Sequence, residues 1–231
     1  MRCVWEHNGN DTLLYSVDLV GAYTRGENLT EAIDKMRAEV NAYLLWAEKA
    51  QITFNGIEIV QDKECSLHIA DADSDVIFNS ERDCLTLEEY RELKALVMKS
   101  AHDFHRLYCA IPDKNRSCLP RRKTFYGYVP RTAREMYDHT KCVNTYYFGE
   151  IDVNADNEGT IFNCRARGFE QLEKVENFLA NPVVEGSYGE LWSLRKVLRR
   201  FLWHDRIHAK AMYRMAVKTF GEQTIPNIFC F

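Results

Sequence analysis

The pattern of apolar residues changes near residue 80, and this change constrains the fold more than any other feature of the sequence. Before that point, short apolar segments alternate or lie beside turn residues, as strands do. Asn55-Gly56 joins two of these segments, a pair typical of a β-hairpin. A single helix is predicted at residues 30–48, with an apolar stripe that includes Met36 and Val40. The predicted strand segments are residues 13–19, 52–54, 57–60, 66–70 and 75–79.

After residue 80 the spacing of apolar residues becomes helical. Two S/T-x-x-E capping boxes, Thr86 to Glu89 and Thr132 to Glu135, each mark the start of a helix. The predicted helices are residues 87–110, 132–148, 168–180 and 191–220. Four amphipathic helices with long connections at 111–130 and 149–167 indicate a four-helix bundle. We therefore predict an α+β protein with two domains, residues 1–82 and 83–231.

Three histidines lie on inward helical faces of the predicted bundle. His204 and His208 are four residues apart, so both side chains share one face with Phe201 and Met215. His139 has the same relation to apolar neighbours on an earlier helix. Buried imidazoles need partners, and these are either backbone carbonyls and hydroxyls or a divalent metal. Nickel and zinc both accept imidazole, and three ligands leave one position open for chemistry.

The same segments carry a resemblance to a known family. Residues 190–208, which include Trp203-His204-Asp205-Arg206-Ile207-His208, are similar to the last helix of DinB/YfiT-like four-helix bundles. Residues 131–139 resemble the second helix of that family, and the resemblance covers roughly residues 83–220. It implies a metal site formed by His139, His204 and His208, and a metal-dependent transferase that uses a low-molecular-weight thiol. A water activated at the same open metal position would instead give a hydrolase. No catalytic base stands out.

Asp205, Asp138 and Tyr137 lie near these histidines in the sequence, and we expect supporting or surface roles for them. His102 and His105 form a second pair, three residues apart. We interpret this pair as ordinary solvated or hydrogen-bonded histidines, because the family resemblance assigns no ligands there.

The N-terminal segment, residues 2–47, is similar to the HicB-like antitoxin module. The matching residues include 19–26 and 29–32, within a pattern of two strands followed by a helix. Antitoxins of this type continue into a DNA-binding segment, whereas this chain continues into predicted helices. The resemblance therefore implies a dimerisation or docking platform, with packing support for the bundle as the simpler alternative.

Two basic clusters are open to several interpretations. One lies on the last helix and the other in the connection at 111–130, where aromatic residues follow the cations. We expect solvated faces, with binding of phosphate or single-stranded nucleic acid, or steering of an anionic thiol, as alternatives. The clusters are Arg195, Lys196, Arg199 and Arg200, and Arg121, Arg122 and Lys123 with Phe125, Tyr126 and Tyr128.

Composition limits the remaining classes of function. The formal net charge of −4 predicts neither a nucleic-acid tail nor a membrane-surface protein. No signal peptide and no apolar run of about 20 residues is present, so we expect a soluble cytoplasmic protein without a membrane partner. The eight cysteines contain no C-x-x-C pair, and we expect reduced thiols.

We therefore expect an enzyme with a small-molecule substrate. A ligand-sensing or protein-interaction module is the alternative, nucleic-acid binding is the least favoured function, and homodimerisation is left open.

Overall fold

The computed structural model describes residues 1–71, 73–124 and 127–231, and it confirms the predicted α+β class. The chain forms two compact units built from separated segments. The first contains residues 1–93, 179–203 and 230, and the second contains residues 94–178, 204–229 and 231. The first unit combines segments from both sides of residue 83, and neither unit is shown to fold independently. The predicted domain boundary between residues 82 and 83 therefore stays a prediction.

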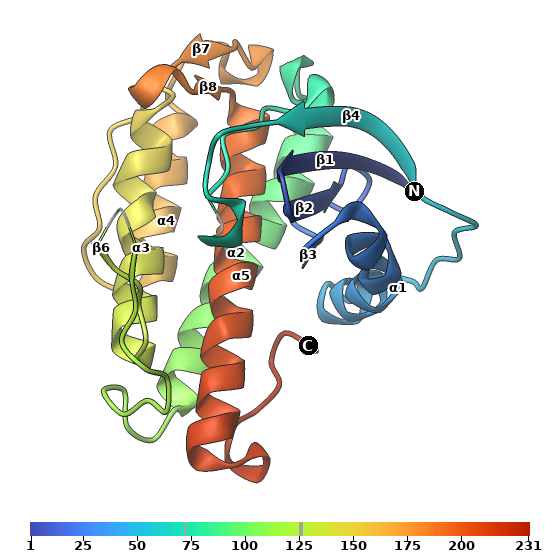
Figure 1. Ribbon diagram of the computed structural model, residues 1–231. Coiled ribbons are helices and arrows are strands. Elements are labelled where there is room, and N and C mark those ends of the chain that lie inside the picture. The colour runs from blue at the N-terminus through green and yellow to red at the C-terminus, as the bar shows by residue number, and fades with distance from the viewer. Residues whose placement is uncertain (72, 125–126) are drawn as a thin grey trace. The chain divides into compact units, whose positions relative to one another are not determined.

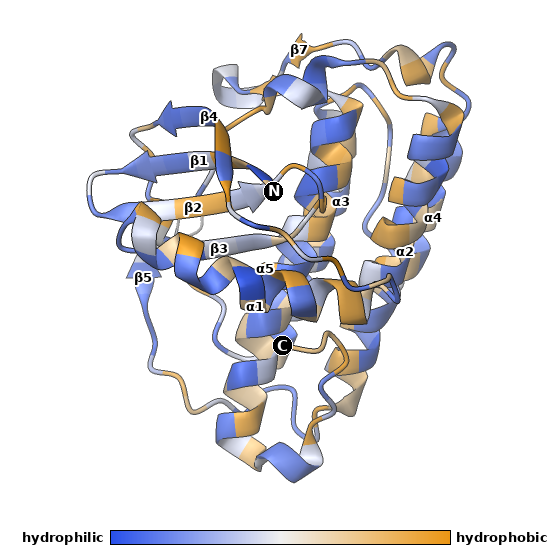
Figure 2. Ribbon diagram, turned by 90° about the vertical axis from the view of Figure 1, so that its right-hand side faces the viewer, coloured by the Kyte–Doolittle hydropathy of each residue, from blue (hydrophilic) through white to orange (hydrophobic). Residues whose placement is uncertain are grey.

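The first unit contains a four-stranded mixed sheet in the order β3-β2-β1-β4, which Figure 2 shows edge to edge. β1 (Arg2–Asn8) and β2 (Asp11–Ser16) form an antiparallel hairpin, and β2 pairs antiparallel with β3 (Tyr23–Gly26). Gly9 begins the two-residue loop of the hairpin with a φ of 55°, as the first position of a type II′ turn requires. β4 (Glu58–Glu64) runs parallel to β1 at the edge.

Helix α1 (Leu29–Trp46) packs against β2 and β3, as Figure 1 shows. Asn28 caps its first turn, with the side-chain oxygen accepting a hydrogen bond from the Glu31 backbone N–H. Met36 and Val40 are fully buried on the face toward the sheet. The predicted helix at 30–48 and its apolar stripe are therefore confirmed.

The predicted hairpin around Asn55-Gly56 is wrong. Residues 52–54 have no regular structure, and the strand that follows pairs with β1 instead. The reason is that β1, which was not among the predicted strands, offers a longer partner. The first ladder contact, the hydrogen bond from Glu58 N–H to the Met1 carbonyl, aligns the two strands in parallel. The predicted strand at 13–19 is shorter than expected and ends at Ser16.

The predicted strands at 66–70 and 75–79 are also wrong. The described residues there are irregular except for short 3-10 turns, and Ala72 of the intervening turn lies outside the described residues. Side chains satisfy the backbone groups that a sheet would otherwise pair. The buried Glu6 carboxylate accepts hydrogen bonds from the backbone N–H groups of Asp75 (3.1 Å) and Val76 (3.2 Å). Arg199 donates to the Val76 carbonyl at 2.8 Å, and Arg200 donates to the Ser74 carbonyl at 2.7 Å.

The described part of the chain after residue 83 contains the helices α2 to α5 that follow in Figure 1, together with two short two-stranded sheets. Both capping boxes predicted from the sequence are formed: Thr86 with Glu89, and Thr132 with Glu135. The elements are α2 (Leu87–Ala110), β5 (Lys123–Thr124), β6 (Gly127–Tyr128), α3 (Ala133–Gly149), α4 (Ile161–Leu172), β7 (Val184–Glu185), β8 (Leu191–Trp192) and α5 (Leu194–Phe220).

The predicted helix at 168–180 is displaced by about two turns. α4 begins at Ile161, because Thr160 caps it by accepting a hydrogen bond from the Asn163 N–H at 3.1 Å. Gly168, which was taken as the start, lies inside α4, where the helix passes close to Phe148 at the end of α3. Within the described residues, no helix has both the length and the apolar character needed to cross a bilayer.

Candidate metal centre

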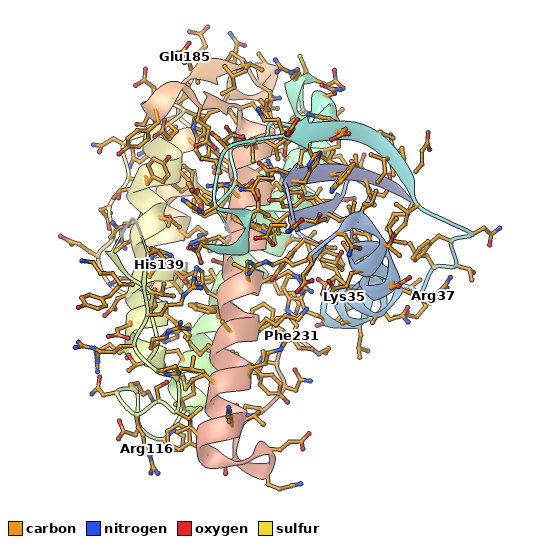
Figure 3. The ribbon with its side chains drawn as sticks, in the orientation of Figure 1. Lys35, Arg37, Arg116, His139, Glu185 and Phe231 are labelled. Carbon is orange, nitrogen blue, oxygen red and sulfur yellow. The ribbon has the colours of Figure 1, made fainter. Side chains whose placement is uncertain are left out.

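His139, His204 and His208 come together in the second unit. His139 is on α3, and the other two lie one turn apart on α5. One ring nitrogen from each histidine lies within 4.8 Å of those of the other two. In the described part of the chain, this is the one group of three or more metal-ligating side chains so arranged. Figure 3 shows the His139 side chain projecting from α3 toward α5.

The spacing of the ring nitrogens fits a tetrahedral metal centre. Two ligand nitrogens at about 2.05 Å from a zinc ion, with a tetrahedral angle between them, lie about 3.3 Å apart. The Nε2 atoms of His139 and His204 are 3.3 Å apart. The ring centroid of His208 is 4.4 Å from that of His204 and 4.7 Å from that of His139. One pair of ring nitrogens therefore has the spacing of a tetrahedral centre, and the third imidazole lies beside both.

Burial keeps the imidazoles of the cluster in the form that binds metal. Desolvation, and to a smaller extent the charge of His139, together lower the pKa of His208 to about 3. Desolvation also lowers the pKa of His139, although part of its side chain reaches solvent. Neutral imidazole is the form that coordinates a metal. Both rings are therefore neutral, and available as ligands, at neutral pH.

Exposure differs among the three histidines. His204 is buried, with 7 % of its surface exposed, whereas His139 is exposed and His208 is intermediate. The cluster therefore reaches solvent on the side of His139.

Buried residues of the second unit hold α5 beside its partners. Asp205, next to His204, forms a bidentate ion pair with Arg165 of α4, and both side chains are fully buried. Burial raises the pKa of Asp205, and Arg165 opposes that rise. The ring of Tyr147, on α3, lies edge-on to His204 with centroids 6.0 Å apart. These contacts fix the rotation of α5, and therefore the direction in which His204 points.

The other residues singled out in the sequence lie outside the cluster. Asp138 is exposed. His102 lies 3.3 Å from the Asp103 carboxylate, and His105 lies 3.0 Å from the Tyr137 hydroxyl. Tyr137 is largely buried and accepts a hydrogen bond from the Ile161 N–H at 3.0 Å. The interpretation of His102 and His105 as hydrogen-bonded histidines agrees with these contacts.

The basic cluster on α5 is not the solvated face that we expected. Lys196, Arg199 and Arg200 are buried in the first unit. Lys196 forms an ion pair with Glu190 at 2.8 Å, Arg199 pairs with Glu81, and Arg200 binds a backbone carbonyl. Buried cations require such partners, and a sequence pattern of basic residues does not distinguish this arrangement from a solvated face.

The second basic cluster is exposed. Arg121 and Lys123 lie over the ring of Tyr128, at 5.2 Å and 5.9 Å from its centroid. Phe125 and Tyr126, which belong to the same predicted cluster, lie outside the described residues.

Two features escaped the sequence interpretation. Arg165, the partner of Asp205, is separated from it by 40 residues, and no local pattern connects the two. The spacing of His105 and Cys109, four residues apart on α2, was visible in the sequence but was not noted. The chain matches no protein-family model, no curated protein and no solved structure.

Proposed function

We propose that the protein is a metal-dependent enzyme that binds nickel or zinc through His139, His204 and His208. The reaction is transfer of a low-molecular-weight thiol to a small molecule, or hydrolysis of one. The observation that carries the metal site is the convergence of three imidazoles, with two ring nitrogens separated by the spacing of a tetrahedral centre.

The reaction class rests on the open position of a three-histidine site and on the DinB-like resemblance of residues 83–220. A divalent metal held there would lower the pKa of a bound thiol or water and so supply a nucleophile at neutral pH. The exposure of His139 gives a small molecule a route to the site. Asp205 and Arg165 orient α5 from the buried side.

The first experiment is metal analysis of the untagged protein beside the single substitutions His139→Asn, His204→Asn and His208→Asn. The matched control is His102→Asn, because His102 is an exposed histidine of the same unit outside the cluster. We expect near-stoichiometric nickel or zinc in the wild type and the control. We expect the affinity to fall by about tenfold or more in the three cluster variants.

Thermal unfolding then separates a catalytic site from a structural one. A ligand present at about 100 times its dissociation constant stabilises a folded chain by about 2.7 kcal/mol, which for a chain of this size raises the Tm by about 5–10 °C. A metal-free protein that stays folded and gains this stability supports a catalytic site. A chain that unfolds on chelation indicates a structural metal.

Absence of metal binding after reconstitution would refute the proposal. A ligand-sensing or protein-interaction module would then be the better interpretation. If metal binds, thiol-dependent turnover of electrophilic small molecules tests the reaction itself. The HicB-like role of residues 2–47 as a dimerisation or docking platform stays a prediction, which the oligomeric state of the full chain tests.

A further inference from the structure

A second group of reactive side chains lies in the second unit, apart from the histidine cluster. Cys109, near the end of α2, is exposed, and its Sγ atom is 3.5 Å from Nε2 of His105, one helical turn earlier. The other ring nitrogen of His105, Nδ1, lies 3.0 Å from the hydroxyl of Tyr137 on α3. The Cys109 thiol, the His105 imidazole and the Tyr137 hydroxyl therefore form a row in which each group lies within hydrogen-bond distance of the next.

The third member of this row is held firmly. The ring of Tyr137 stacks on Tyr108, with centroids 4.2 Å apart, and lies parallel to Phe104 at 5.9 Å. Its hydroxyl accepts a hydrogen bond from the Ile161 N–H at the start of α4. The phenol oxygen is therefore fixed from both sides, and its position fixes the ring of His105.

This hydrogen-bond pattern allows one tautomer of His105 to accept the proton of the thiol. The Tyr137 oxygen has two lone pairs, and the Ile161 N–H occupies one of them. When the other accepts the Nδ1–H of His105, Nε2 of the neutral ring faces the thiol as an acceptor. Desolvation, together with His102, lowers the pKa of His105, so the ring is neutral at pH 7. Lys114 donates to the Cys109 backbone carbonyl at 3.0 Å.

We propose that Cys109 is a nucleophilic site for small, soft carbon electrophiles, with His105 as the base and Tyr137 as the residue that positions it. In the reaction, the S–H proton of Cys109 moves to Nε2 of His105, and the sulfur attacks the electrophilic carbon. A C–S bond forms, the bond from that carbon to its leaving group breaks, and the leaving group departs with the electron pair. The imidazolium then releases its proton to water.

The probe is iodoacetamide, applied to the full chain at pH 7 with a chelator present, and the labelling rate of each cysteine is measured by peptide mass spectrometry. Cys142 is the matched control, because it is also exposed on a helix of the second unit, and among the described residues its thiol has no hydrogen-bond partner. His105 accepts the thiol proton as the sulfur attacks, and the described residues provide no such hydrogen-bonded base for Cys142. We expect Cys109 to react about threefold faster than Cys142.

Two substitutions assign the roles. His105→Gln is expected to lower the Cys109 rate to that of Cys142. Tyr137→Phe keeps the stacked ring and removes the hydroxyl, so it is expected to lower the Cys109 rate as well. The buried Cys164 distinguishes positioning from packing, because loosening near Ile161 would expose it and raise its labelling.

The proposal predicts that in Tyr137→Phe the labelling rate of Cys109 falls while Cys164 stays unlabelled. Labelling of Cys164 in Tyr137→Phe would overturn the positioning role of Tyr137. Equal rates for Cys109 and Cys142 in the wild type, or an unchanged rate in His105→Gln, would overturn the nucleophilic site.

Discussion

Removing the charge of Asp205 by the substitution Asp205→Asn should strongly destabilise the second unit. The Asp205 carboxylate and the Arg165 guanidinium are both fully buried and are joined by two N–O contacts, one of them 3.2 Å long. The substitution leaves the guanidinium buried without its counter-charge. The ion pair also lies next to His204, so its loss should disturb the metal centre.

The size of the effect follows from burial. Two unit charges about 4 Å apart attract each other by about 4 kcal/mol at the effective dielectric constant of about 20 that applies to proteins. Breaking a buried pair by removing one partner costs about 3–5 kcal/mol. Replacing both side chains with apolar ones of similar volume, as in Arg165→Met combined with Asp205→Leu, removes the unpaired charge. We therefore expect the double variant to be far more stable than either single variant.

The assay is urea unfolding of the metal-free full chain, followed by far-UV circular dichroism, across the wild type, the two single variants and the double variant. α4 offers a matched control two residues away. Arg167 forms a bidentate pair with Asp156, but both of these side chains are exposed. Asp156→Asn should leave the free energy of unfolding nearly unchanged, because water screens an exposed pair.

Two results would contradict the reasoning. If Asp156→Asn destabilised the protein as much as Asp205→Asn, burial would not be the cause. If the double variant lost the sum of the two single effects, Arg165 and Asp205 would not be energetically coupled.

Other changes test the packing, the protonation and the polar network. Gly168→Ala would bring a Cβ atom to 2.6 Å from Cδ2 of Phe148, so we expect a loss of about 1–3 kcal/mol in chemical denaturation. Gly149→Ala meets no atom within 4 Å and is the control, with a gain of up to about 1 kcal/mol. The pKa of His208 is about 3 in the folded protein and about 6.5 in the unfolded chain. Between pH 3 and pH 6.5 the unfolded chain therefore binds more protons than the folded protein does. The contribution of His208 to the free energy of unfolding of the metal-free protein should be fully present above about pH 6.5. Below that pH it should fall by at most about 1.4 kcal/mol per pH unit. The variant His208→Asn should lack this pH-dependent contribution. Glu6→Ala leaves buried backbone N–H groups without their acceptor, and the unfolding free energy should fall by about 2–4 kcal/mol.

Local signals in the sequence predicted the helices well. The capping boxes at Thr86 and Thr132 placed the starts of α2 and α3, because a cap is a contact between residues three apart. The same locality explains why the spacing of His204 and His208 predicted their shared face. His139 was predicted to join them from an inward face of another helix; the structure brings the three together, but His139 itself is exposed.

The errors arose where distant residues determine the conformation. Residues 75–79 have the composition of a strand, but Glu6 and Arg199 take up their backbone groups. The basic stripe of α5 looked solvated, since nothing in its own sequence shows that Glu81 and Glu190 approach it. α4 was displaced because a glycine was read as a helix boundary, whereas here Gly168 allows close packing against Phe148.

The irregular segment at residues 74–81 has a consequence for the order of folding. Its partners on α5 lie far along the chain: Arg199 is 118 residues beyond Glu81, and Arg200 is 126 residues beyond Ser74. During synthesis the N-terminal strands emerge from the ribosome first and can pair locally, but this segment must wait until residue 200 has been translated. Contacts of such long sequence separation close late, because the entropy of the intervening loop must be lost first. Until then, the nascent chain carries a segment of strand-like composition that lacks its partners on α5, although the four strands of the sheet have already been synthesised.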